Sequence, residues 1–184
     1  MSVRTALFAS VVGLSLAACG GGITVNTDYD PAAGPAMAAY KTYSWLPSTQ
    51  HQGDQLTSAR IKGAVDNQLA AKGFRKIEGD AADFRVTYIL ALEGKVDYTT
   101  TTSGTGYGYG GWYGRGGIGM TSSRTTATEW TQGTLAIDII DGKKSEMVFR
   151  SVGQAEVTPD LTPAERSERV NEAVLEMLRD FPPK

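Results

Sequence analysis

Residue types that usually carry chemistry are scarce in this chain. Its 184 residues contain one cysteine, Cys19, and one histidine, His51. One cysteine cannot form an intramolecular disulfide, and one cysteine with one histidine supplies too few ligands for a zinc site. Serine and cysteine hydrolases need a base beside the nucleophile, but His51 lies in a polar stretch typical of a surface loop. We therefore expect no zinc site and no such triad.

The chain also lacks an excess of charge of either sign. It has 18 Lys and Arg residues against 20 Asp and Glu residues, which gives a formal net charge of -2. Nucleic acids attract strongly basic surfaces, so no nucleic-acid partner is expected. Hydrophobic residues make up 41% of the chain and charged residues 21%, as in ordinary globular domains. Without a leader, the length suits one domain.

No apolar run is long enough to span a bilayer. A spanning helix needs about 20 apolar residues, whereas the core of a signal peptide needs roughly 7 to 15. The segment Ala6–Leu16 follows the basic residue Arg4 and precedes small residues. This arrangement predicts a cleavable signal peptide over residues 1–18.

The segment from Leu16 to Gly20 (Leu-Ala-Ala-Cys-Gly) resembles the lipobox of bacterial lipoproteins. The resemblance implies cleavage before Cys19 and acylation of its thiol. Two or more acyl chains would hold the protein durably on a membrane, with residues 19–22 as a glycine-rich tether. Gly20 lacks the inner-membrane signal that an aspartate gives in enterobacterial lipoproteins, which implies the periplasmic face of the outer membrane. A secreted protein with an incidental Cys19 is the alternative.

Alternation of apolar and polar residues predicts a sheet. The clearest run covers residues 84–93, and a weaker pattern continues to Thr102 and resumes over Thr121–Thr128. These threonine-rich flanks predict a hairpin that extends beyond the core. Further strands are predicted at residues 23–29, 40–46, 74–77, 135–140 and 147–157.

Apolar residues at spacings of three and four predict two helices. The first is capped by Thr57 or Ser58, runs to about Lys72 with Asp66 on its outward face, and ends at Gly73. The second begins at the capping-box sequence Thr162-Pro163-Ala164-Glu165. We predict a single α+β domain over residues 23–184, with a largely antiparallel sheet of about five to six strands and both helices on one face.

Several segments, taken in order, resemble one family. They include Tyr40–Pro47, Ala70–Phe74, Gly133–Asp138 and the terminal Phe181–Pro183. Together they are similar to domain of unknown function 4136, a family of bacterial envelope lipoproteins, over nearly all of the mature chain. The resemblance implies a location and a fold type, but no reaction, catalytic residue or cofactor.

An insert at residues 103–119 is rich in glycine and aromatic residues. Its glycines match the dinucleotide-binding pattern G-x-G-x-x-G, but no helix pattern follows, so that interpretation fails. Exposed aromatic side chains could stack on sugar rings or contact a protein, and an ordinary hairpin tip is the alternative. The candidate binding residues are Tyr107, Tyr109, Trp112, Tyr113 and Arg115.

Three acidic residues, Asp28, Asp30 and Glu129, could carry chemistry. Asp28 and Asp30 share a strand face and could bind calcium, but aspartates before a proline also suit a turn, and no metal is expected. Glu129 is the candidate acid of a glycan hydrolase because the indole of Trp130 beside it could keep a carboxyl group protonated. An outward strand position is the alternative for Glu129.

The sequence as a whole favours a non-enzymatic binding or structural module of the cell envelope, anchored to the membrane through Cys19. Its expected partner is another envelope protein or a glycan, and no cofactor is expected. The alternative is an envelope glycan hydrolase or glycan-binding protein.

Overall fold

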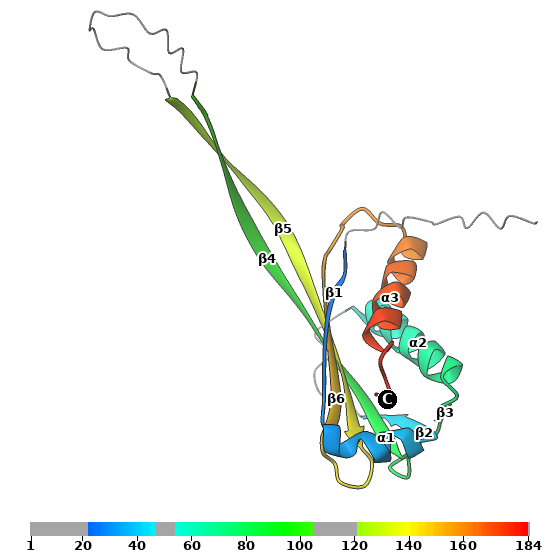
Figure 1. Ribbon diagram of the computed structural model, residues 1–184. Helices are drawn as coiled ribbons and strands as arrows, with labels where there is room; N and C mark the ends of the chain where they lie inside the picture. Colours follow the sequence, from blue (N-terminus) through cyan, green and yellow to red (C-terminus); the bar gives the residue numbers. More distant parts are fainter. Residues whose placement is uncertain (1–21, 47–53, 105–120, 184) are drawn as a thin grey trace, which may run out of the picture.

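A six-stranded sheet with helices on one face forms the body of the protein (Figure 1). This computed structural model describes residues 22–46, 54–104 and 121–183. The order of strands in the sheet is β1-β6-β5-β4-β2-β3, so the predicted α+β fold is confirmed. The strands are β1 (Thr24–Tyr29), β2 (Thr42–Trp45), β3 (Arg75–Lys76), β4 (Phe84–Gly104), β5 (Thr121–Asp141) and β6 (Met147–Glu156).

The sheet is mostly, but not wholly, antiparallel. The pairs β1–β6, β6–β5 and β5–β4 are antiparallel, whereas β2 pairs parallel with both β4 and β3. Helix α2 (Gln55–Ala71) lies between β2 and β3 in the chain. Parallel neighbours need such a crossover connection, so the mixed pairing follows from the order of the elements.

Helix α2 begins earlier than its sequence pattern predicts. The carboxylate of Asp54, and not Thr57 or Ser58, caps this helix by accepting a hydrogen bond of 3.1 Å from the Leu56 amide. Aspartate is a strong N-cap residue, and here it lies one turn ahead of the predicted caps. At the other end, Gly73 has a φ of +90°, the left-handed conformation expected after a helix.

Helix α3 (Pro163–Met177) begins at the predicted capping box, in which Thr162 and Glu165 bind each other's backbone amides. A short segment that was not predicted also forms: the 3-10 helix η1 (Pro31–Ala33) and helix α1 (Gly34–Ala39). Small residues and prolines leave this segment without an apolar period, although Met37 is fully buried. None of the described helices has the length and apolar character needed to cross a membrane.

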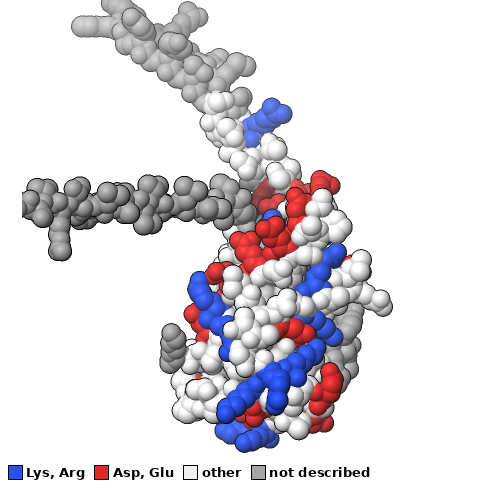
Figure 2. Space-filling view, turned by 90° about the vertical axis from the view of Figure 1, so that its right-hand side faces the viewer, with Lys and Arg blue, Asp and Glu red and all other residues white. Residues whose placement is uncertain are grey.

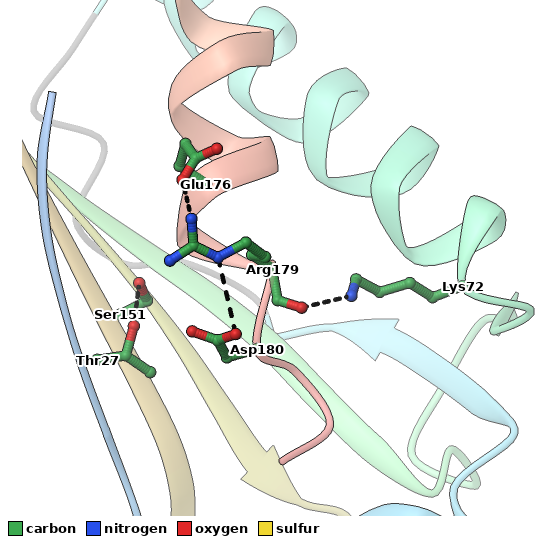
Figure 3. A network of polar contacts seen from close by, with 6 residues as sticks. All are labelled: Thr27, Lys72, Ser151, Glu176, Arg179 and Asp180. Carbon is green, nitrogen blue, oxygen red and sulfur yellow. Dashed lines mark hydrogen bonds and ion pairs between the residues drawn. The ribbon is translucent and has the colours of Figure 1, made fainter. Parts of the chain in front are cut away.

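The hydrophobic core lies between the sheet and the two long helices (Figure 1). Polar contacts beside the core join their carboxyl ends (Figure 3). The Lys72 ammonium donates to the Arg179 carbonyl at 3.1 Å, and Arg179 forms an ion pair with Glu176 at 2.6 Å. Across the sheet, the hydroxyl groups of Thr27 in β1 and Ser151 in β6 are 3.2 Å apart.

Strands β4 and β5 continue far beyond the rest of the sheet as a two-stranded hairpin (Figure 1). Their pairing runs from Gly94 with Thr131 to Gly104 with Thr121, after β6 has ended. At about 3.4 Å per residue, this projecting part is roughly 35 Å long. The predicted hairpin is confirmed, and most of the insert at residues 103–119 lies outside the described residues.

Candidate functional site: the projecting hairpin

Several candidates from the sequence lie outside the part of the chain that the structure describes. They are Cys19, His51, Tyr107, Tyr109, Trp112, Tyr113 and Arg115. Of the two candidate calcium ligands, Asp30 caps η1 by accepting a hydrogen bond of 2.9 Å from the Ala32 amide. Within residues 22–46, 54–104 and 121–183, no group of three or more His, Cys, Asp or Glu side chains is placed to hold a metal ion.

Glu129 does not form the pair with Trp130 that the sequence suggested. Neighbouring residues of a strand point to opposite faces, so the indole lies on the face away from Glu129. There its Nε1 donates a hydrogen bond of 2.7 Å to the Asp97 carboxylate. Glu129 is exposed on the other face, opposite Val96. The arrangement gives Glu129 the outward strand position considered as the alternative.

The two faces of the projecting hairpin differ in polarity. On one face, polar side chains satisfy each other: Trp130 with Asp97, and Lys95 with Glu93 at 2.9 Å. The other face carries Val96 and Tyr98, which are 46% and 72% exposed. Ala127, the cross-strand partner of Tyr98, is exposed beside them, and Glu129 lies opposite Val96 on the same face. We call these three residues, Val96, Tyr98 and Ala127, the apolar strip.

Both long edges of the hairpin lack a neighbouring strand among the described residues. Strand β2 pairs with β4 only as far as Val86, and the last backbone bond from the β6 side is from the Val157 amide to the Thr131 carbonyl at 2.8 Å. Unpaired edges are templates for another strand, and proteins usually protect them with charges or prolines. The segment Thr99–Thr102 contains neither. This part of the hairpin edge therefore carries neither kind of protection.

Away from the hairpin, the carboxylate of Asp66, which was expected on the outward face of its helix, accepts three hydrogen bonds. Its Oδ1 instead accepts hydrogen bonds from the Tyr43 hydroxyl at 2.8 Å and the Trp45 indole at 2.9 Å. Its Oδ2 binds the Lys76 ammonium at 2.9 Å. Burial alone would raise the pKa of Asp66, but these bonds outweigh burial and lower it. Asp66 thus connects α2 to β2 and β3.

Two further carboxylates hold the ends of strands. Hydrogen bonds from the Lys41 amide, and from the amide and hydroxyl of Thr42, lower the pKa of Asp83. Burial tends to raise the pKa of Asp141, but bonds from the Tyr40 hydroxyl and the turn that follows lower it overall. Both groups are engaged within the fold, which assigns them a structural role.

These three lowered pKa values predict a loss of stability in acid. A carboxyl group whose pKa is lower in the folded state stabilises the protein above the unfolded pKa, about pH 4, and this contribution disappears as the pH falls through the folded pKa. We expect the free energy of unfolding, measured in urea between pH 7 and pH 3, to fall below about pH 4. Asp66→Asn should lower stability at pH 7 and make that acid loss smaller. An unchanged pH profile would contradict this role of Asp66.

The architecture is that of an α+β domain with one mostly antiparallel sheet and its long helices on one face. The chain belongs to the family described as Domain of unknown function (DUF4136), whose model matches residues 25–183. The comparison with curated proteins found no match.

Solved structures with a similar fold have little sequence identity with this chain. A PDZ domain protein from Parabacteroides distasonis ATCC 8503 aligns with 88% of this chain, at 13% identity and a TM-score of 0.54. The chain covers 36% of that protein's length, so the likeness concerns the fold alone. Two dodecamers of PelC from Paraburkholderia phytofirmans align with 85% of this chain and 95% of theirs, at 14% identity and TM-scores of 0.47 and 0.44.

Proposed function

We propose that this protein is a lipid-anchored, non-enzymatic binding module of the bacterial cell envelope, which binds another envelope protein along its projecting hairpin. The observation that carries this proposal is the apolar strip, exposed on one face of a hairpin whose other face is internally paired.

The energetics of the hairpin support a partner. An isolated two-stranded hairpin is at best marginally stable in water, and a further strand or a packed surface is needed to stabilise it. Covering Val96 and Tyr98 would remove apolar area from water, and burial of each such side chain contributes about 1.5–3 kcal/mol. The free edges would add backbone hydrogen bonds to a partner strand. A protein partner would therefore both bury these apolar side chains and pair with a free edge of the hairpin.

The lipobox-like segment supports the membrane anchor in this proposal. Cleavage before Cys19 would leave only Gly20, Gly21 and Gly22 between the lipid and Ile23. Such a short tether would keep the domain near the surface of the bilayer. The outer membrane, on its periplasmic face, is the proposed location because Gly20 lacks the retention signal.

Site-specific photo-crosslinking tests the binding face. A benzoyl-phenylalanine placed at position 98, in the apolar strip, should give a discrete crosslinked product in intact envelopes. The same residue at position 99 points to the opposite face and is the matched control, from which we expect little product. A product of twice the protein's own mass would identify the partner as a second copy. Equal products from both positions, or none from either, would refute binding through the apolar strip.

A further inference from the structure

A pocket of about 350 Å³ lies between the sheet and the two long helices. It is found at the end of the domain from which the hairpin projects, since Leu92 of β4 and Gly133 of β5 line its floor. Residues of α2 and α3, such as Ile61 and Val170, form its walls. The apolar strip of the hairpin lies outside this pocket, so the pocket is a second site.

Two glycines of the sheet line the pocket. Gly133 and Gly153 lie on the helix-facing side of the sheet, at positions where alternation would otherwise place apolar side chains. A Cβ atom at Gly153 would lie 2.8 Å from the Met177 sulfur, and one at Gly133 would lie 3.0 Å from the Val157 side chain. The absence of side chains at these two positions therefore makes room for the side chains of Met177 and Val157, which line the pocket.

The pocket is apolar and open at its rim. Leu92 and Val157, which line it, are 62% and 38% exposed. Water in an apolar cavity finds few hydrogen-bond partners, and its replacement by an apolar group is favourable. The space fits about twelve units the size of a water molecule, at roughly 30 Å³ each. A methylene group is of similar size, so an alkyl chain of about twelve carbons would fill the pocket.

Basic side chains accompany this apolar surface. Arg60 of α2 and Arg166 of α3 line the pocket. Arg166 donates to the carbonyls of Leu161 and Pro159 at 3.0 and 2.8 Å, which uses two of the five donors of a guanidinium. These bonds leave the positive charge of Arg166 beside neutral acceptors. An acidic headgroup at the rim would complement it.

The carboxylates near the pocket are already engaged or directed elsewhere, although Figure 2 shows acidic as well as basic side chains on the helix-bearing side. Asp54 caps α2, and Glu165 accepts bonds from the amide and hydroxyl of Thr162. The Glu156 side chain alternates away from Ala155, which faces the helices. Arg60, Arg166 and Arg169 line the pocket together with Asp54 and Glu156, so basic residues outnumber acidic ones there.

We propose that this pocket binds a fatty acid, with the alkyl chain between the sheet and the helices and the carboxylate near Arg60 and Arg166. Shape, apolar lining and the sign of the available charge all match this class of ligand. The site does not depend on the hairpin's partner or on lipidation of Cys19, so its failure would leave the proposed function untouched.

A displacement titration tests the proposal on the full chain carrying Cys19→Ala, which removes the site of lipid attachment. A fluorescent fatty acid is bound first and is then displaced by saturated fatty acids of eight to sixteen carbons. We expect affinity to rise about fourfold per added methylene and to level off near twelve carbons. Absence of saturable binding, or affinity that rises steadily to sixteen carbons, would overturn the proposal.

A second test compares a substitution that fills the pocket with a control substitution on the same helix. Ala173 of α3 lines the pocket, and Asn171 is exposed on the same helix. Ala173→Leu should weaken binding at least tenfold, whereas Asn171→Leu should leave it within about twofold. Circular dichroism establishes that both variants are folded. Equal binding by the two variants would place the ligand elsewhere and refute the assignment.

The headgroup is tested with a fatty acid and the fatty alcohol of the same length. We expect the wild-type pocket to bind the acid about tenfold more tightly, since charge-assisted hydrogen bonds are the stronger kind. Arg60→Gln should reduce this preference and leave binding of the alcohol unchanged. If Arg60→Gln weakens both ligands equally, Arg60 does not recognise the carboxylate.

Discussion

Phe84→Ala should lower the free energy of unfolding by about 3–5 kcal/mol, the range found when a large buried aromatic side chain is removed. Phe84 is fully buried at the start of β4. Its ring lies 5.2 to 5.8 Å, between centroids, from the rings of four aromatic residues contributed by distant parts of the chain. These are Tyr40, Tyr43, Phe74 and Phe181.

The expected loss of stability is large because the Phe84 ring contacts several elements of the fold. Its neighbours come from the segment after α1, from β2, from the end of α2 and from the segment after α3, so a cavity there loosens several elements at once. Single domains have a net stability of about 5–15 kcal/mol, of which this loss is a large part.

Urea unfolding followed by tryptophan fluorescence measures the loss of stability in Phe84→Ala. Leu175→Ala, at a half-exposed position of α3, should change stability by less than about 0.5 kcal/mol. A similar small change for Phe84→Ala would contradict this role of the ring.

Cys19→Ala should abolish attachment of the protein to the membrane. In the proposed function, acyl chains on this one thiol, the only one in the chain, supply the whole anchor. Radiolabelled palmitate should enter the wild-type protein and not the variant, and the variant should leave the membrane fraction after export. Gly22→Ala changes the same segment at a position with open space around it, and it should keep both label and location. Membrane attachment that persists in Cys19→Ala would refute the lipid anchor.

Local patterns in the sequence were sufficient to predict most of the elements. The alternation from Phe84 onward, the capping box at Thr162 and the glycine at position 73 each specify their conformation through neighbouring residues alone. Segment Pro31–Ala39 was missed because alanine, glycine and proline produce no apolar period, even where the segment buries Met37.

The pairing of the strands and the composition of the candidate sites depend on contacts between segments, which no local sequence pattern contains. The parallel neighbours of β2 and the bonds of Asp66 to Tyr43, Trp45 and Lys76 join residues far apart in the chain. The pocket likewise combines α2, β4, β5, β6 and α3. Strand alternation could, however, have separated Glu129 from Trp130, because adjacent strand residues face opposite sides.

The position of β1 has a consequence for the order of folding. The bond between Thr27 and Ser151 spans 124 positions, so among the described strands the first one pairs only with the last. Contacts of such separation form late because a long loop must close first. During synthesis, which starts at the N-terminus, β1 would therefore stay unpaired until β6 has followed.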